Sequence, residues 1–191
     1  MKLIFATTNE GKLVELRELL DGAVELVRPG ELEVEEDQTT FEGNAEKKAA
    51  EWCAKFGLPA LADDSGLCVD ALGGRPGVYS ARYAPDSPSR IAKLLGELQG
   101  VPAEKRTARF RCALALAIPG KPVRIEVGDC EGTILEAPRG EHGFGYDPVF
   151  ALRGLQKSLA EMTSAQKAVV SHRGKAFRAM LPHLLAAASG R

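Results

Sequence analysis

The sequence lacks the features that define several large classes of protein. Its few cysteines show neither CxxC spacing nor the density of a disulfide scaffold; they are Cys53, Cys68, Cys112 and Cys130. We therefore expect buried thiols rather than a disulfide framework. No apolar run approaches the roughly 18 residues that span a bilayer, so no membrane partner is expected. The opening residues 1–6 are too short and too soon polar for a signal peptide, which favours a cytoplasmic location.

An excess of charge of one sign is also missing. The chain has 25 basic and 26 acidic residues, a formal net charge of −1. Such a balance gives no general attraction to nucleic acid or to anionic membranes, so no nucleic-acid partner is expected. Any phosphate binding must then come from a local basic site. The 191 residues, 45% apolar and 27% charged, suit one globular domain over residues 1–191.

Strand-like and helix-like segments mix along the chain without strict alternation. Helical patterns cover residues 41–56, 89–98, 164–170 and 174–188, and another helix follows the polar loop at residues 7–12. Strand patterns cover residues 3–6, 23–27, 60–62, 67–69, 108–118, 123–135 and 149–152. Thr39 or Thr40 can cap the 41–56 helix, and Gly57 closes it. The mixture predicts an α/β fold with a mixed sheet.

Two adjacent carboxylates, Asp63 and Asp64, follow a short apolar run and precede Ser65-Gly66, which we read as a turn. Magnesium prefers oxygen ligands and usually keeps waters and substrate phosphates in its shell, so one or two carboxylates suffice. We assign Asp64 to metal ligation and to polarising a water. Asp63 either orients Asp64 or binds an outer water. Alone, such a pair is more often a solvated turn or a helix cap.

A second carboxylate for this predicted Mg²⁺ site lies in the acidic segment before the 41–56 helix. Our choice is Glu36, and spacing alone does not separate it from its acidic neighbours, which are Glu33, Glu35 and Asp37. Ser65 either donates to a phosphate oxygen or simply forms the turn.

A polar loop near the N-terminus is the candidate phosphate site. It reads Thr7-Thr8-Asn9-Glu10-Gly11-Lys12, and it leaves a strand and opens a helix. Free backbone N–H groups, two hydroxyls, an amide and one lysine are thereby placed where an anion would dock. The Gly-Lys-Ser/Thr ending of a Walker A motif is missing. The alternative is a capped helix start with a solvated Lys12.

Two further segments offer groups for a nucleobase. One reads Phe144-Gly145-Tyr146-Asp147 and combines an aromatic face, close backbone approach and a carboxylate, which suits a purine or its sugar. Alternatively, Phe144 plugs the core. The other segment pairs His172 with Arg173, whose donors can bind a base carbonyl or a phosphate, and Lys167 lies five residues before His172. The alternative is helix capping by His172 and an exposed Arg173.

As an ordered set, these motifs resemble the inosine triphosphate pyrophosphatase family, the non-canonical purine NTP pyrophosphatases or XTP/dITP diphosphatases. The resemblance runs nearly end to end. It rests on residues 6–12, 40–49, 63–72, 76–83, 143–148 and 171–174. Each motif is modest alone, and the ordered set is highly specific.

The resemblance implies hydrolysis of ITP, dITP and XTP to the monophosphate and pyrophosphate, by Mg²⁺-assisted water attack on the α-phosphorus. It implies Asp64 as general base and metal ligand, Glu36 as second metal ligand, and Ser65 as a phosphate contact. It implies that residues 7–12 hold the triphosphate, that Lys167 contacts the nucleotide, and that the base pocket is lined by Phe144–Asp147, His172 and Arg173. It also implies a mixed, elongated sheet with flanking helices, two lobes around a central nucleotide-binding cleft, and a homodimer.

Two other functions compete with this interpretation. A pyrophosphatase of the same architecture can act on pyrimidine or modified nucleotides, as in the Maf-like proteins, but the Ser-x-Ser-Pro-Arg-Arg start typical of those is absent. A nucleotide sensor without turnover would keep residues 7–12 and 144–147 and would not need Asp64.

Overall fold

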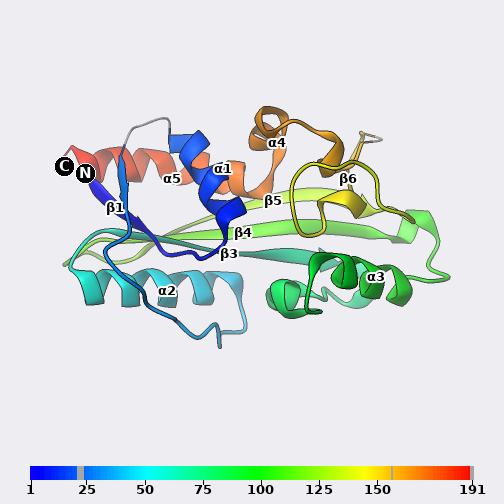
Figure 1. Ribbon diagram of the computed structural model, residues 1–191, viewed down its shortest axis with the longest axis horizontal. Coiled ribbons are helices and arrows are strands. Elements are labelled where there is room, and N and C mark those ends of the chain that lie inside the picture. The colour runs from blue at the N-terminus through cyan, green and yellow to red at the C-terminus, as the bar shows by residue number, and fades with distance from the viewer. Residues whose placement is uncertain (21–23, 156, 190–191) are drawn as a thin grey trace. The chain divides into compact units, whose positions relative to one another are not determined.

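The computed structural model describes residues 1–20, 24–155 and 157–189, and it confirms the mixed α/β fold (Figure 1). In the described residues, the sheet has the strand order β2-β1-β3-β4-β5-β6. The strands are β1 Lys2–Phe5, β2 Glu25–Val27, β3 Ala60–Val69, β4 Thr107–Ala117, β5 Arg124–Ile134 and β6 Phe150–Leu152. The helices are α1 Glu10–Leu20, α2 Phe41–Phe56, α3 Ser87–Glu97, α4 Ser164–Val170 and α5 His172–Ala188. β1 is parallel to β2 and β3, whereas β5 and β6 are antiparallel.

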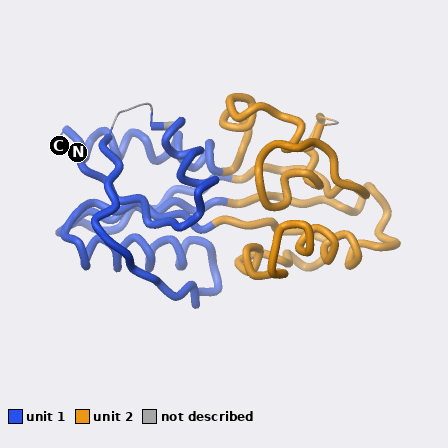
Figure 2. The backbone as a smooth tube through the Cα atoms, in the orientation of Figure 1, with its two compact units in different colours: residues 1–64, 112–128, 173–191 blue, residues 65–111, 129–172 orange. Residues whose placement is uncertain are grey.

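The chain divides into two compact units (Figure 2). Unit 1 comprises residues 1–64, 112–128 and 173–191, and unit 2 comprises residues 65–111 and 129–172. The long strands β3, β4 and β5 each contribute residues to both units. Each unit has its own cluster of buried apolar side chains.

Unit 1 packs α1 and α5 against one face of its strands, and α2 covers the opposite face (Figure 1). The register places Lys2 of β1 opposite Glu25 and Ile4 opposite Ala60. The core contains apolar side chains from β1, α1, β3, β4 and α5, including Leu3, Leu16, Leu61, Leu114 and Phe177. This packing fixes the first half of β3 and the start of α1, the two segments that carry the predicted phosphate and metal residues.

Unit 2 builds its core from the second half of β3, from α3, and from parts of β4, β5 and β6. Its buried side chains include Leu67, Leu94, Phe110, Phe150 and Leu159. Tyr146, from the predicted base segment, belongs to the same cluster. The loop that carries this tyrosine is therefore anchored on the core of unit 2.

Local sequence signals set several helix ends. The hydroxyl of Thr40 accepts the Gly43 N–H at 3.1 Å and caps α2, and Gly57 ends that helix at φ 65°, as predicted. α3 begins at Ser87, two residues before the predicted start, because the Asp86 carboxylate accepts the Ser89 N–H at 2.8 Å. α5 begins at His172 and continues through Pro182 as one element. The strand predicted for residues 23–27 is β2, and residue 23 lies outside the described residues.

The predicted turn at residues 63–66 is wrong. β3 is one continuous strand from Ala60 to Val69 and is buried along nearly all of its length. β1 pairs with its first residues, Ala60 and Leu61, and β4 is its neighbour on the other edge. Burial within the sheet outweighs the weak strand preference of Asp, Ser and Gly. Ser65 therefore lies within a strand, and the turn reading of that residue is excluded.

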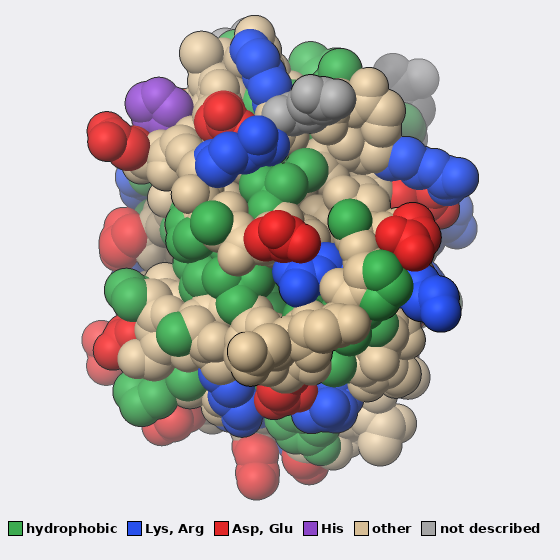
Figure 3. All heavy atoms as spheres, turned by 90° about the vertical axis from the view of Figure 1, so that its right-hand side faces the viewer, with side chains coloured by type: hydrophobic (Ala, Val, Ile, Leu, Met, Phe, Trp, Pro, Cys, Tyr) green, Lys and Arg blue, Asp and Glu red, His purple; other side chains and the backbone are tan. Residues whose placement is uncertain are grey.

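The remaining sequence predictions concern burial, membranes and surface charge. The cysteines are free and buried, as predicted. Within the described ranges, no helix is long and apolar enough to cross a membrane. On the face drawn in Figure 3, acidic and basic side chains are interspersed with apolar ones, which agrees with the near-zero net charge of the chain.

Candidate active site

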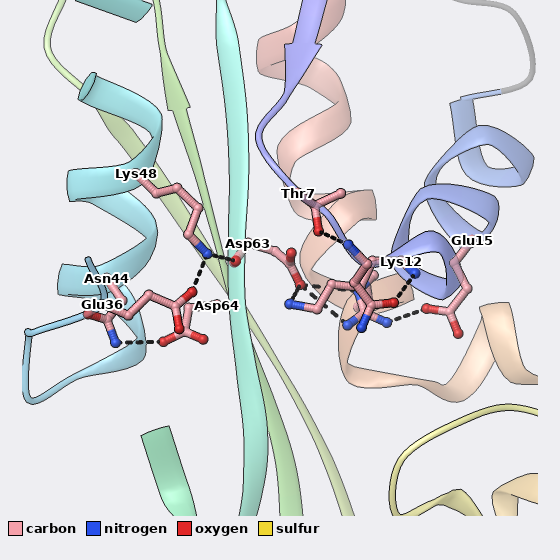
Figure 4. A network of polar contacts seen from close by, with 10 residues as sticks. Thr7, Lys12, Glu15, Glu36, Asn44, Lys48, Asp63 and Asp64 are labelled. Atoms are coloured by element: carbon pink, nitrogen blue, oxygen red, sulfur yellow. Dashed lines mark hydrogen bonds and ion pairs between the residues drawn. The ribbon is translucent and has the colours of Figure 1, made fainter. Parts of the chain in front are cut away.

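Asp63 and Asp64 project to opposite sides of β3 (Figure 4). Successive side chains of a strand alternate between the two faces of a sheet, so continuity of the strand separates these adjacent carboxylates. Asp63 meets Lys12 and Arg173, whereas Asp64 lies beside Asn44 and Glu36 (Figure 4). One strand thus places two carboxylates in different electrostatic surroundings.

Asp63 is a fully buried counterion for two cations. Its Oδ2 lies 2.9 Å from the Lys12 Nζ and accepts from Nε and Nη2 of Arg173, both at 3.3 Å. Arg173 also donates to Glu15 of α1. Burial alone would raise the pKa of Asp63, but the charges of Lys12 and Arg173 outweigh it and hold that pKa well below its usual range. Asp63 is therefore ionised, and it holds both cations in place.

Asp64 lies in a less favourable setting for a negative charge. Its Oδ2 accepts a hydrogen bond of 2.9 Å from the side-chain amide of Asn44, and 5% of the residue is exposed. Burial and, to a smaller extent, the charge of Glu36 raise the pKa of Asp64, and the hydrogen bond from Asn44 opposes them. Together these effects raise the pKa from 3.8 to about 6. Of the two adjacent aspartates, Asp64 is therefore the one whose negative charge is disfavoured.

Glu36 is held beside Asp64 by a lysine of α2. The Lys48 Nζ donates to the Glu36 carboxylate and also to the backbone oxygen of Asp63, the latter at 3.1 Å. Asp37, one of the acidic neighbours that competed with Glu36, instead pairs with Lys47 at 2.9 Å. The structure therefore favours Glu36 over Asp37 as the carboxylate that acts on Asp64.

Asp64 and Glu36 suit a divalent cation that takes only some of its ligands from the protein. Among the described residues, no group of three or more His, Cys, Asp or Glu side chains is arranged to hold a metal ion. Asp64 and Glu36 are neighbouring carboxylates, and the pKa of Asp64 is raised by burial and, to a smaller extent, by the charge of Glu36, so a divalent cation would stabilise their negative charges. The remaining ligands would come from water and phosphate, as is usual for Mg²⁺.

The 7–12 segment forms the start of α1, as the sequence predicts. The hydroxyl of Thr7 accepts the Asn9 N–H at 3.2 Å, and the Asn9 side chain accepts the Lys12 N–H at 3.1 Å. These bonds are those of a helix cap. Thr8, Asn9 and Glu10 are exposed, and Gly11 and Lys12 are half-buried. Capping and anion binding are compatible here, because the exposed residues of the loop remain accessible to a ligand.

In unit 2, a buried ion pair organises the 143–147 loop. The Lys167 Nζ donates to the Asp147 carboxylate at 2.8 Å, and the same oxygen accepts the Phe144 N–H at 2.9 Å. The Lys167 ammonium also lies 4.6 Å from the centroid of the Phe144 ring. Gly143 has φ 80°, and a Cβ there would overlap the Asp147 carboxylate. The predicted nucleotide contacts 144, 147 and 167 therefore touch one another.

The aromatic side chains of this loop differ in exposure. The Phe144 side chain remains 36% exposed, so the prediction that it plugs the core is wrong. Tyr146 is buried, and its hydroxyl donates to the backbone oxygen of Ser80 at 2.9 Å. Gly145, between them, is half-buried with φ 65°.

His172 and Arg173 are adjacent in sequence but have different neighbours. The His172 ring stacks on Phe110, with centroids 4.8 Å apart and planes 12° apart. Arg173 is buried in the Asp63 network, so the prediction of an exposed Arg173 is wrong. Ser65 is half-buried on β3.

Three residues of the site had no assigned role in the sequence reading. Asn44 and Lys48 lie one helical turn apart on α2, and both act on the carboxylate pair. Glu15 pairs with Arg173 from α1. The signal for the first two is their i, i+4 spacing beside an acidic loop. No local sequence signal predicts that Glu15 belongs to the site.

The mixed α/β fold and the central strand that carries two carboxylates among lysines and an arginine are features of an enzyme that acts on phosphates. Comparison with known proteins shows the family to which this chain belongs. The chain belongs to the Ham1 family, whose model matches residues 3–183. Membership agrees with the resemblance inferred from the motifs.

Several relatives are similar over nearly their whole length. The dITP/XTP pyrophosphatase of Geobacillus kaustophilus is 49% identical over 189 residues, which cover 92% of this chain and 90% of that protein. The dITP/XTP pyrophosphatase of Geobacter sulfurreducens is 49% identical over 191 residues, covering 96% of each. Among solved structures, a HAM1 protein from Coxiella burnetii is 38% identical, with a TM-score of 0.88 over 96% of this chain and 98% of that one.

Proposed function

We propose that this chain hydrolyses non-canonical purine nucleoside triphosphates, namely ITP, dITP and XTP, to the nucleoside monophosphate and pyrophosphate. The observation that carries the proposal is its 49% identity, over nearly the full length, to enzymes named dITP/XTP pyrophosphatases. The motifs of the sequence imply the same activity. Removal of such nucleotides from the cellular pool is the role that this activity supports.

We assign proton acceptance from the attacking water to Asp64. A pKa of about 6 leaves Asp64 mostly ionised at neutral pH and able to take up a proton, as a general base requires. Asp64 and Glu36 would hold Mg²⁺, which supplies charge neutralisation and lowers the pKa of bound water. The carboxylate pair beside Asn44 and Lys48 supports this assignment.

We assign the triphosphate to residues 7–12, with Ser65 as a further phosphate contact. Lys12 is fixed by its ion pair with Asp63, so its ammonium is oriented before a nucleotide arrives. Cations held in this way spread the negative charge that develops when water attacks the α-phosphorus. Lys48 lies on the other side of β3, where it bridges Glu36 and the backbone oxygen of Asp63 beside the proposed metal site.

We assign the base to Phe144–Asp147, His172 and Arg173, with Lys167 as a further contact to the nucleotide. The exposed Phe144 ring offers a stacking face, and the Lys167–Asp147 pair and the His172–Phe110 stack hold their groups rigidly. Donors in this set would pair with the 6-oxo group of hypoxanthine or xanthine. The exocyclic amine of adenine would leave them facing a donor, which costs about 1–3 kcal/mol per buried unpaired group.

The homodimer, implied by the resemblance, and the cytoplasmic location, inferred from the lack of a signal-peptide pattern, both remain predictions. Sedimentation of the purified protein tests the first: a mass of twice 20.4 kDa would support the dimer. A mass that stays at 20.4 kDa across concentrations would contradict it.

The decisive experiment measures hydrolysis of ITP, dITP and XTP against ATP, GTP, dTTP and UTP with Mg²⁺, and assays pyrophosphate and orthophosphate separately. Pyrophosphate release from the inosine and xanthosine nucleotides alone would support both reaction and substrate class. Orthophosphate release, or preference for pyrimidines, would overturn the purine proposal. If no nucleotide is hydrolysed, the hypothesis of a nucleotide sensor without turnover would replace that of an enzyme.

A further inference from the structure

Three segments of unit 2 meet at one residue, Ser80, that the sequence reading did not assign to the site. Ser80 lies in the short 3-10 helix Gly77–Arg82 and is 6% exposed. Its hydroxyl accepts the Leu67 N–H of β3 at 2.9 Å and donates to the Gly77 oxygen at 2.6 Å. Its backbone oxygen accepts the Tyr146 hydroxyl at 2.9 Å. The hydroxyl of Ser80 thus binds β3 and its own 3-10 helix, and its backbone oxygen binds the loop that carries Tyr146.

The segments joined in this way carry predicted nucleotide contacts. Leu67 lies two residues after Ser65 on β3, and Ser65 is the predicted phosphate contact of unit 2. Tyr146 lies in the Phe144–Asp147 loop, which is the predicted base segment. Within unit 2, Ser80 is therefore the hydrogen-bonded link between a phosphate contact and the base loop.

The link is built from buried groups, which makes it stiff. The Leu67 residue is fully buried, and a buried backbone N–H without an acceptor is costly, so the Ser80 hydroxyl holds its position firmly. Burial raises the pKa of the Tyr146 phenol, which therefore stays protonated and remains a donor to the Ser80 carbonyl. These two buried hydrogen bonds connect the base loop to β3 and resist its movement.

We propose that Ser80 is a positioning residue for nucleotide hydrolysis, which fixes the base loop relative to the Ser65–Leu67 segment through Leu67 and Tyr146. The proposal rests on the proposed function. As a consequence, a correct base that binds to the base loop also places the phosphates correctly against the Ser65–Leu67 segment. Loss of the link should reduce turnover of a correct base more than that of an incorrect one, because only a correct base uses the alignment.

The test is a double-mutant cycle between Ser80→Ala and Tyr146→Phe. Each variant removes one oxygen at one end of the link. We measure kcat and KM for ITP and for ATP in both single variants, the double variant and the unmodified protein. Each single variant should lower the ratio of kcat/KM for ITP to that for ATP roughly tenfold, mainly through kcat for ITP. The double variant should lose little more than either single one, because both interrupt the same link.

A matched control distinguishes positioning from a general loss of packing. Ser158 is another buried serine of unit 2, and its hydroxyl donates to the Arg139 oxygen at 2.6 Å. Ser158→Ala removes this bond and the contribution of its hydroxyl to the capping box with Glu161, but it touches none of the bonds of the link, so it should leave the ITP to ATP ratio unchanged. Thermal unfolding of all variants shows how much stability each has lost.

Three results would overturn the role of Ser80. They are equal losses for ITP and ATP, additive effects of the two variants on the ratio, and a Ser158→Ala variant that shifts the ratio as strongly as Ser80→Ala. Failure of the proposed function looks different, because the unmodified protein would then release no pyrophosphate from ITP. An unmodified protein that is active, with a ratio that Ser80→Ala does not change, rejects the positioning role alone.

Discussion

Asp64→Asn is expected to abolish hydrolysis and, at the same time, to stabilise the metal-free protein. The substitution keeps the shape of the side chain and can keep the hydrogen bond to Asn44 by exposing its own carbonyl oxygen. It removes a buried negative charge beside Glu36, and that charge is unfavourable in the folded state. Activity and stability should therefore change in opposite directions at this position.

The magnitude follows from the pKa of Asp64. A rise from 3.8 to about 6 corresponds to roughly 3 kcal/mol of folding free energy, at 1.36 kcal/mol per pKa unit. Because the folded pKa is the higher one, this group's stabilisation is fully present below pH 3.8 and is lost as pH rises through about 6. At pH 8 the charged carboxylate destabilises the metal-free protein, so Asp64→Asn should gain up to roughly 3 kcal/mol there.

The assay is urea unfolding in EDTA at pH 8 and at pH 4.5, paired with pyrophosphate release from ITP at pH 8 with Mg²⁺. The stability gain should be large at pH 8 and small at pH 4.5. Activity should fall by a factor of roughly 10³ or more, since a general base contributes 10²–10⁴ and metal ligation is weakened as well. Binding of ITP, measured by calorimetry, should survive.

The neighbouring residue provides a control with the opposite sign. The pKa of Asp63 is depressed by Lys12 and Arg173, so its stabilisation is present above pH 3.8 and is lost as pH falls. Asp63→Asn leaves the buried Arg173 and the half-buried Lys12 without their shared partner and should cost about 3–5 kcal/mol at pH 8. If both substitutions destabilise the metal-free protein equally at pH 8, the assignment of opposite environments is refuted. If Asp64→Asn retains hydrolysis, its role as the base is refuted.

Three further substitutions test other parts of the structure. Lys167→Met leaves the buried Asp147 carboxylate without its cation and should cost about 3–5 kcal/mol in urea unfolding; a loss below about 1 kcal/mol would show that the pair is not a tight buried one. Gly143→Ala forces a side chain into positive φ and against Asp147. It should raise KM for ITP and cost about 1–3 kcal/mol, and unchanged kinetics would contradict the tight loop geometry. Thr40→Ala removes the cap of α2 and should cost about 1 kcal/mol without altering selectivity between ITP and ATP, measured by urea unfolding and steady-state kinetics.

Elements with local start and stop signals could be predicted from the sequence. α2 has a capping hydroxyl at Thr40 and a left-handed glycine at Gly57, so both of its ends were found. β3 has no such signals. Asp63-Asp64-Ser65-Gly66 is a turn sequence by local preference, and only its burial in the sheet, beside β4, makes it a strand. That information lies in residues far along the chain.

The same division applies to the candidate site. The motifs led us to predict Asp64, Glu36 and the 7–12 segment, because acidic pairs and polar, glycine-containing segments carry a chemical signature of their own. The position of Arg173 could not be found in this way, because it meets Asp63 across 110 residues of sequence. Asn44 and Lys48 were visible as a helical pair, but their target, the carboxylate pair, becomes a neighbour only through the fold.

Continuity of β3 is what allows two identical side chains to take different roles. In a turn, Asp63 and Asp64 would share solvent and would titrate alike. In a strand they face opposite sides, so one meets Lys12 and Arg173 and the other meets Asn44 and Glu36. The register against β1, with Phe5 opposite Leu61, fixes which carboxylate faces which side. A slip of one residue would exchange the two environments, so the register of β3, as much as the acidic residues themselves, determines which carboxylate can serve as a base.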